Sequence, residues 1–296
     1  MKLRIFSLFV LFCLISILSS PVFADPPKMG TVEDVTAFSH IRARGPMVVE
    51  VTVGEAPSVQ VELSKKGHRL VHVKIKDDTL ILRPEVFNPP INLVGLKARV
   101  IVTTTKVDSV RSQASADIVL TGKDGGPLDV KSIGSGQVTL VGRADSLDAN
   151  IHGSGDLRAD RFTAGVVKIK NSGQASIRLG GATTSLELDS MGQGDFHIRK
   201  IDVHKLVANI LGGADLNLSG KAKKAVFDVN GSGDIDARKL AVDEFEATMG
   251  GSGDITVTVN QSIKVNGYGS GNLYYYGDAP ETSIKVHGST TVEHKK

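Results

Sequence analysis

The sequence has no tryptophan and a single cysteine, Cys13, among its 296 residues. Cys13 lies in an N-terminal segment that we expect to be removed on export. The mature protein would then contain no disulfide bond, thiol nucleophile or thiolate metal site. The sequence also has little excess of one charge over the other, since 35 Lys and Arg residues are interspersed with 32 Asp and Glu residues. We therefore expect no basic face and no nucleic acid partner.

Aromatic residues are few, with 10 Phe and 4 Tyr, whereas the sequence contains 32 Gly and many aliphatic and β-branched residues. This composition favours many short strands separated by turns and argues against a helical bundle. Beyond the N-terminus, no apolar run approaches the roughly 20 residues of a membrane-spanning helix. The mature chain is therefore predicted to be an all-β protein without a transmembrane segment.

The first 24 residues have the pattern of an export signal. Lys2 and Arg4 precede an apolar stretch over residues 5–18, and the small-residue pattern Val22-Phe23-Ala24 closes the segment. We expect a signal peptide over residues 1–24 that is cleaved after Ala24. The next residues, 25–30, contain two prolines and are predicted to be a loose leader.

A repeat of about 19 residues organises the chain over residues 109–296. The clearest copies open with a Gly-Ser-Gly-Asp turn followed by an aliphatic residue, as at residues 153–157 and 231–235. We call the first residue of each turn the marker residue, and successive markers are 18 to 20 residues apart. The markers are Ala114, Gly134, Gly153, Gly173, Gly192, Gly212, Gly231, Gly251, Gly269 and Gly288. This periodicity predicts a β-solenoid of about ten coils.

Apolar columns within the repeat show which side of each strand faces the core. The fifth residue is apolar in every copy, for example Leu157 and Ile235, and the seventh residue is apolar in nearly all. A third apolar column lies four residues before each marker, from Val110 to Ile284. Apolar residues two apart are typical of strands with one buried face. A single coil buries too little to offset its conformational entropy, so the coils must stack.

Residues 31–108 lack the marker but contain strand-like alternation, as at residues 48–53 and 71–75. This pattern predicts an N-terminal β-rich head. Its simplest role is to cap the first coil, whose open end would otherwise expose strand edges and core.

The Phe38-Ser39-His40-Ile41 segment, the Gly45 turn and the strand pair from Leu70 to Leu82 precede the serial Gly-Ser-Gly-Asp turns. Together these features resemble the GIN-domain family, whose members are described as auto-transporter adhesin heads. The resemblance covers residues 31–292 and implies a right-handed β-helix-like solenoid in an exported bacterial protein with an adhesive role. No long segment follows the last copy that would supply an autotransporter's membrane barrel. We therefore expect the protein in the periplasm, or secreted to the cell surface.

The fourth position of the repeat carries aspartate in four consecutive coils, at Asp195, Asp215, Asp234 and Asp254. Strand alternation points these side chains outward, about 5 Å apart. One interpretation is a calcium site, although calcium takes six to eight oxygen ligands. The other is that each carboxylate accepts hydrogen bonds from turn N–H groups. Because the nine-residue repeat of calcium-binding rolls is absent, we predict no metal and no cofactor.

The tyrosines form the second candidate site. All four lie within one coil length, and Tyr275 takes the inward seventh position, so that Tyr274 and Tyr276 project outward side by side. Such a pair can stack on sugars or anchor a protein partner. The alternative is that these residues only favour the strand and shield the last coils.

The last four residues, 293–296, are polar and do not cover the final coil. Either their charge prevents pairing at the open strand edge, or the edge supports weak end-to-end self-association or binds another envelope protein.

Two function classes follow from these observations. The first is an exported, non-enzymatic binding or structural solenoid of the bacterial cell envelope, with a protein or glycan as its partner. The second is a carbohydrate-active enzyme, a polysaccharide lyase or hydrolase, which needs clustered carboxylates or basic residues in a groove. The eight histidines are scattered, and paired aspartate columns on opposing faces are not evident. We therefore prefer the first class and assign no catalytic residue.

Overall fold

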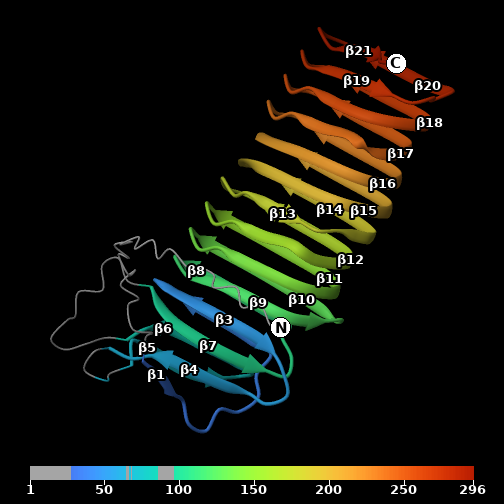
Figure 1. Ribbon diagram of the computed structural model, residues 1–296. Coiled ribbons are helices and arrows are strands. Elements are labelled where there is room, and N and C mark those ends of the chain that lie inside the picture. Colours follow the sequence, from blue (N-terminus) through green and yellow to red (C-terminus); the bar gives the residue numbers. More distant parts are fainter. Residues whose placement is uncertain (1–27, 65–66, 68, 86–96) are drawn as a thin grey trace, which may run out of the picture.

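The computed structural model describes residues 28–64, 67, 69–85 and 97–296 of the protein. These residues form strands and turns, and none of them belongs to a helix that would be long and apolar enough to cross a membrane. The strands stack into a rod with the N-terminal strands at one end and the C-terminal strands at the other (Figure 1). The predicted signal peptide lies outside the described residues, and the predicted leader is described only from Lys28, with Met29 and Gly30 already in the first strand.

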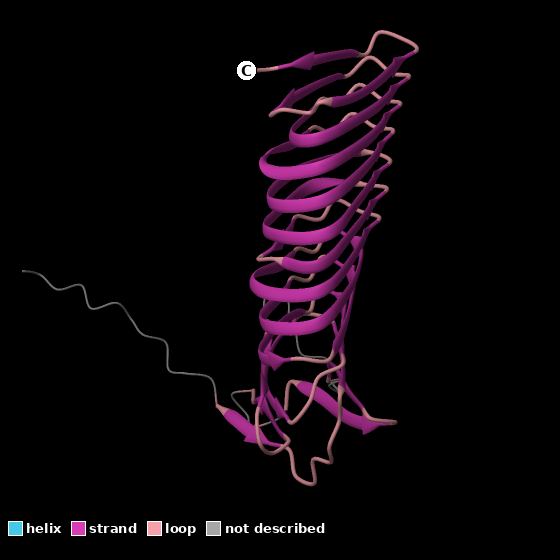
Figure 2. Cartoon of the chain, turned by 90° about the vertical axis from the view of Figure 1, so that its right-hand side faces the viewer, coloured by secondary structure: helices cyan, strands magenta, loops and turns pink. Residues whose placement is uncertain are grey.

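The strands of the N-terminal part are β1 (Met29–Thr31), β2 (His40–Arg44), β3 (Met47–Val53), β4 (Ser58–Glu62), β5 (Val71–Lys76), β6 (Thr79–Pro84) and β7 (Ala98–Thr104). The strands of the repeat region are β8 (Ser109–Ala114), β9 (Asp117–Asp124), β10 (Pro127–Gly134), β11 (Val138–Gly153), β12 (Leu157–Asn171), β13 (Ile177–Leu179), β14 (Ala182–Ser190), β15 (Gln193–Ile210), β16 (Gly213–Val229), β17 (Ile235–Met249), β18 (Ile255–Gly267), β19 (Asn272–Tyr276), β20 (Glu281–Val286) and β21 (Thr291–His294). The long strands turn a corner of the rod and contribute to two of its sides (Figure 2).

Neighbouring coils pair in parallel, with the register that the repeat predicts. Val138, a fifth-position residue, lies between its counterparts Ile118 and Leu157. Two continuous parallel ladders result. We call the ladder of strand segments that follow the glycine turns the post-turn sheet, and the ladder of segments that precede them the pre-turn sheet. The stacked coils make a β-solenoid of about nine turns, because the last copy contributes only β21.

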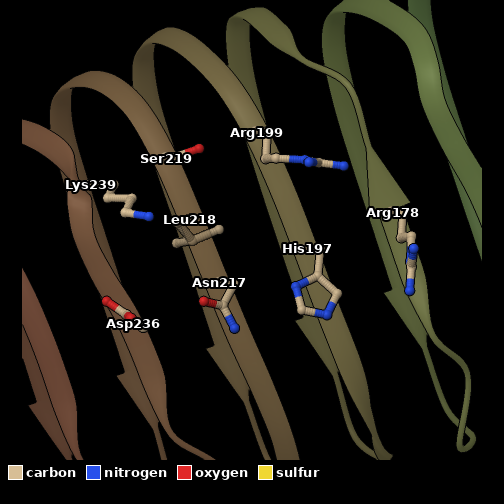
Figure 3. Close-up of a pocket in the computed structure, with 8 residues that line it drawn as sticks. All are labelled: Arg178, His197, Arg199, Asn217, Leu218, Ser219, Asp236 and Lys239. Atoms are coloured by element: carbon tan, nitrogen blue, oxygen red, sulfur yellow. The ribbon is translucent and has the colours of Figure 1, made fainter.

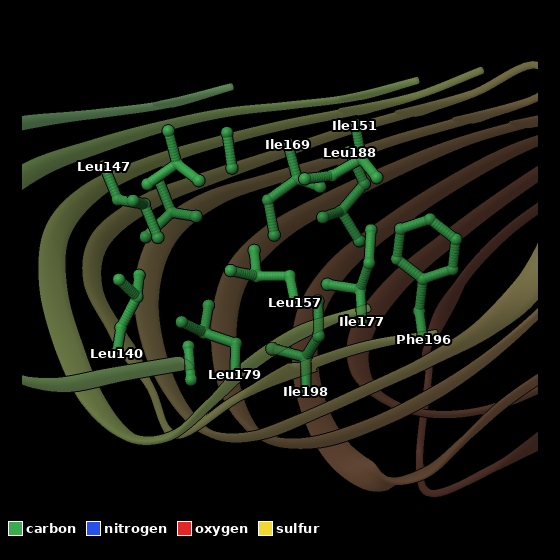
Figure 4. Close-up of a cluster of buried hydrophobic side chains, with 14 of the residues drawn as sticks. Leu140, Leu147, Ile151, Leu157, Ile169, Ile177, Leu179, Leu188, Phe196 and Ile198 are labelled. Atoms are coloured by element: carbon green, nitrogen blue, oxygen red, sulfur yellow. The ribbon is translucent and has the colours of Figure 1, made fainter. Parts of the chain in front are cut away.

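The core is a continuous stack of apolar side chains along the axis of the rod. Leu157, Ile177 and Phe196 hold the fifth position in three consecutive coils, and each is 0% exposed. Side chains from both sheets meet between the strands (Figure 4). Ile284 departs from the predicted inward column and is 40% exposed. The reason is that β20 pairs only with β18 among the described strands, so no described coil covers its other side.

Close approach between coils explains the marker glycines. A Cβ atom at Gly173 would lie 1.9 Å from the carbonyl oxygen of Gly153 in the preceding coil. Gly134 and Gly153 have a left-handed φ, but Gly173 does not. Space, rather than backbone conformation, is therefore the requirement that these glycines share.

The N-terminal strands extend the stack at its base and then close it. β2 and β3 pair in parallel with β8 and β9, and so form one more coil beneath the repeats. β6 and β7 pair in parallel with the other edges of β2 and β3 and form a second coil. Below these, β5 and β4 pair antiparallel with β6 and β7, and β1 pairs antiparallel with β4. The segment predicted as a head is thus joined to the solenoid by continuous ladders.

Candidate functional site

Every site residue predicted from the sequence projects from the outer face of the post-turn sheet. The fourth, sixth and eighth positions of successive copies form three outward columns on this face. In the sixth-position column, His197 lies between Arg178 and Asn217. The same column continues through β17 and β18 to Tyr274. Neighbouring members of a column are about 4.8 Å apart.

The aspartates of the fourth position tie consecutive coils together. The carboxylates of Asp215 and Asp234 accept the main-chain N–H groups of the fourth-position residues in the next coil, at 2.9 and 2.8 Å. Asp254 accepts both the main-chain N–H of Asn272, at 2.7 Å, and its side-chain amide, at 3.0 Å. Each donor therefore belongs to the next coil and not to the turn of the aspartate itself. Within the described ranges, no cluster of three or more His, Cys, Asp or Glu residues is arranged to hold a metal ion.

The tyrosines of β19 alternate as the strand pattern predicts. Tyr275 packs against the core, and its ring stacks on His294 with centroids 4.7 Å apart. Tyr274 and Tyr276 project from the outer face and are half-buried, about 7 Å apart along the strand. The ammonium group of Lys295 lies 4.8 Å from the centre of the Tyr274 ring. One ring of the predicted pair is thus already in contact with a cation.

Tyr268 is the fourth tyrosine of this coil length and was not part of the predicted pair. It is 58% exposed, lies just after β18 at the corner before the turn, and stacks on His287 with centroids 5.5 Å apart. Its place four residues before the post-turn strand separates it from the Tyr274 and Tyr276 pair. The four tyrosines therefore do not form one cluster.

A hollow of about 330 Å³ opens on the same outer face, over β13, β15, β16 and β17 (Figure 3). Its floor includes Leu218, which is 3% exposed. The other side chains around it are polar or charged: Arg178, His197, Arg199, Asn217, Ser219, Asp236 and Lys239. The hollow lies where β16 carries the short side chain of Ser219 between Arg199 on β15 and Lys239 on β17, with Asn217 beside the longer His197.

Two of the charged groups around the hollow are neutralised by partners. Arg199 donates a hydrogen bond to Asp160 at 2.8 Å, across the coil that carries Gly180 at this position. Asp236 accepts two side-chain hydrogen bonds from Arg238, at 3.0 and 2.6 Å. The hydrogen bonds from Arg238 lower the pKa of Asp236 below its ordinary value, so Asp236 stays ionised and paired. The remaining cations, Arg178 and Lys239, have no ion-pair partner within 4 Å among the described residues.

The lining of the hollow was not predicted, although most of its residues hold the outward sixth and eighth positions of the repeat. Arg178, His197 and Asn217 hold the sixth position in three consecutive copies, and Ser219 holds an eighth position. Reading these outward columns in the same way as the inward columns would have located the hollow, since the register is set by the markers.

The stacked coils define a β-solenoid whose post-turn sheet carries polar, charged and aromatic side chains on its outer face. Residues 37–186 and 180–279 match the family described as "Putative auto-transporter adhesin, head GIN domain". The chain therefore belongs to the GIN-domain family, as the resemblance indicated, and is an adhesin-like protein. No curated protein matches its sequence.

Solved structures of similar fold include proteins of two Parabacteroides species. A "putative adhesin" from Parabacteroides distasonis is similar with a TM-score of 0.50 at 19% identity, over 91% of this chain and 98% of that one. A "putative adhesin" from Parabacteroides merdae has a TM-score of 0.49 at 18% identity, over 92% of this chain and 96% of that one. A "putative lipid binding protein" from Parabacteroides distasonis has a TM-score of 0.49 at 17% identity, over 92% and 98%. The first of these likenesses agrees with the solenoid fold.

Proposed function

We propose that the protein is an exported, non-enzymatic binding protein of the bacterial cell envelope that uses the outer face of its post-turn sheet to hold a glycan or protein. The observation that carries this proposal is the side-by-side projection of Tyr274 and Tyr276 from β19. Tyrosine rings supply contact area at low conformational cost and pair an apolar body with a polar tip. The outward side chains of the sheet around them are exposed or half-buried, which leaves room for an extended partner.

The chemistry of the carboxylates supports a binding role over catalysis. Glycoside hydrolysis needs two carboxyl groups placed on either side of the scissile bond. On this face the carboxylates of Asp215, Asp234 and Asp254 are acceptors for main-chain N–H groups of the next coil. Asp236 is held by Arg238. These side chains therefore hold the fold together rather than face a substrate bond.

Export is supported by the N-terminal sequence pattern and by membership of an adhesin-like family. Expression of the full chain in a bacterial host should yield protein outside the cytoplasm that begins at Asp25. N-terminal sequencing of each cell fraction tests this. Protein that keeps Met1 and stays in the cytoplasm would contradict export. The periplasmic, medium and surface fractions distinguish the three destinations.

A glycan array and an envelope-protein pull-down with the mature protein test the binding face. We expect Tyr274→Ala and Tyr276→Ala each to weaken binding of the captured partner by about tenfold, the loss of one aromatic contact of roughly 1.4 kcal/mol. Tyr268→Ala is the matched control, because it removes a more exposed tyrosine from another part of the surface. Equal losses in all three variants would contradict the assignment of this face.

Catalysis is tested with the same material. The protein should release no new reducing ends or unsaturated products from polysaccharides during prolonged incubation. Cleavage of any of them would favour the polysaccharide lyase or hydrolase alternative.

A further inference from the structure

The hollow on the post-turn sheet combines free positive charge with neutral hydrogen-bonding groups in two neighbouring columns that run along the rod. We propose that it binds the carboxylate or sulfate groups of an acidic polysaccharide that lies across the stacked strands. This inference rests on the proposed function, because it names the ligand chemistry of the same sheet face.

The two free cations stand at opposite ends of the hollow. Arg178 projects from β13 and Lys239 from β17, in neighbouring columns and three strand spacings apart along the rod. Three spacings are about 14 Å. Both side chains are exposed, and neither is paired with a carboxylate within 4 Å in the described part of the chain. An arginine matches a carboxylate or sulfate group with two parallel hydrogen bonds, and a lysine adds a point charge. Two anionic groups on one chain are therefore the natural occupants.

The floor between these cations offers neutral donors and acceptors. Asn217 and Ser219 lie side by side on β16, with His197 next to them on β15 (Figure 3). Their short side chains leave room for a ligand against Leu218. Amide, hydroxyl and imidazole groups are suited to the hydroxyl groups of a sugar. The hollow thus matches a chain in which charged substituents alternate with hydroxyl-rich rings.

The surroundings select against broad polyanions. The fourth-position column, including Asp195, Asp215 and Asp234, runs along one side of the hollow, about 7 Å from the sixth-position column. A wide anionic surface such as duplex nucleic acid would meet these carboxylates and be repelled. A single polysaccharide chain can instead follow the sixth-position column, where the carboxylate in its path, Asp236, is paired with Arg238.

The same strip leads to the tyrosines. Tyr274 belongs to the column of His197, four strand spacings further along, which is about 19 Å. A linear polymer seated in the hollow and running along the rod would therefore reach the aromatic pair. Ionic contacts in the hollow and ring stacking at β19 would act on one ligand, which raises its affinity through multiple contacts.

The test is equilibrium binding of the mature protein to dextran sulfate, to polygalacturonate and to uncharged dextran at fixed salt. We expect binding to one or both acidic polymers and at least tenfold weaker binding to dextran. The two acidic arms distinguish sulfate from carboxylate as the recognised group. The double variant Arg178→Gln/Lys239→Gln should weaken binding to the acidic polymer by about tenfold.

The matched control is Lys170→Gln/Lys285→Gln, which removes the same charge from exposed positions of the pre-turn sheet. We expect this control to change binding by less than twofold. Equal losses in both double variants, or equal binding to single-stranded DNA, would mean general attraction of polyanions and would overturn the proposal. Binding of neutral glycans that depends on Tyr274, without binding of either acidic polymer, would overturn this inference and leave the proposed function standing. If the mature protein bound no glycan and no envelope protein, both this inference and the proposed function would be overturned.

Discussion

Replacing Gly231 with alanine tests the requirement that holds the coils in register. A Cβ atom at Gly231 would lie 1.8 Å from the carbonyl oxygen of Gly212, and 2.8 and 2.9 Å from its carbonyl carbon and nitrogen. All three atoms belong to the main chain of the preceding coil, so no side chain can turn away to make room. The same carbonyl accepts the N–H of Ser232 at 2.9 Å.

The expected cost follows from this geometry. Ordinary contact needs at least 3.4 Å, so the two coils must separate at the turn by about 1.6 Å. Overpacking of a tight contact costs about 1–3 kcal/mol. The separation also stretches the hydrogen bond from Ser232, which is worth about 1 kcal/mol. We therefore expect Gly231→Ala to lower the free energy of unfolding by about 2–4 kcal/mol.

The control lies in the neighbouring turn. A Cβ atom at Gly213 would meet only the side chains of Ser232 and Gln193, at 3.4 and 3.8 Å, and its φ is not in the left-handed region. Gly213→Ala should therefore change the free energy of unfolding by less than about 1 kcal/mol. The change should be stabilising if its main effect is to lower the conformational entropy of the unfolded chain. Urea unfolding followed by circular dichroism compares the two, and hydrogen exchange shows whether the loss is local to these coils. Equal stability of the two variants would refute the close-approach argument.

Four further predictions concern the core, the aspartate column, calcium and a buried lysine. Ile235→Asp places an unpaired carboxylate at a position that is 1% exposed, so cooperative unfolding should be lost, and a melting curve like that of the parent would show the inward column to be misassigned. Asp254→Ala removes the acceptor of two hydrogen bonds from Asn272 and should cost about 1–2 kcal/mol, whereas Asp254→Asn keeps an acceptor and should cost less. Saturating calcium should leave the melting temperature of the parent unchanged, and a rise that Asp215→Asn abolishes would instead establish a calcium site. Burial lowers the pKa of Lys123 below its ordinary value of 10.5. Holding the charged lysine in the fold therefore costs stability, and this cost is complete at any pH below the folded-state pKa. The cost decreases as the pH rises from the folded-state pKa to 10.5. Lys123→Met should therefore raise the melting temperature at pH 7, and the gain should shrink toward pH 10.5 in a melting series, while a gain that grows with pH would contradict this sign.

The stacked coils could be predicted from the sequence because equivalent positions of successive copies pair with one another, so the spacing of the markers gives the register. A residue such as Leu157 recurs at one position of every copy, so its burial in one coil implies burial in the next. The exception, Ile284, shows the limit of that inference. Its column position is inward, but burial also requires a neighbouring strand on each side, which the column pattern does not encode.

The base of the rod could not be ordered in the same way. The strands β2 and β3 lie between the coil made by β6 and β7 and the first repeat coil, although β6 and β7 come later in the chain. Strand alternation identifies such segments without saying which of them pair. Pairing between distant segments without a shared marker depends on the whole packing arrangement, so alternation alone gives only a β-rich head.

In the candidate sites, the role of each side chain depends on a partner in another copy of the repeat. The sequence placed Asp234 outward and made it a hydrogen-bond acceptor, but its donor is the N–H of Asp254, 20 residues later. Arg199 pairs with Asp160 across an intervening glycine, 39 residues away. Because the paired groups sit in different coils, they become visible only when the copies are aligned as a stack.

The inward and outward columns of this solenoid are subject to different physical limits. An inward residue such as Phe196 is enclosed by the coils on both sides, so its size is fixed by close packing. An outward residue such as Asn217 is exposed, and its replacement costs little stability as long as it does not touch the markers or the aspartate ladder. The shape and charge of the binding face are therefore set coil by coil, by side chains whose exchange leaves the fold intact. The hollow lies where the short side chain of Ser219 is flanked by Arg199 and Lys239 of the neighbouring coils, so Asn217→Arg beside it should fill the space while the rod keeps its register.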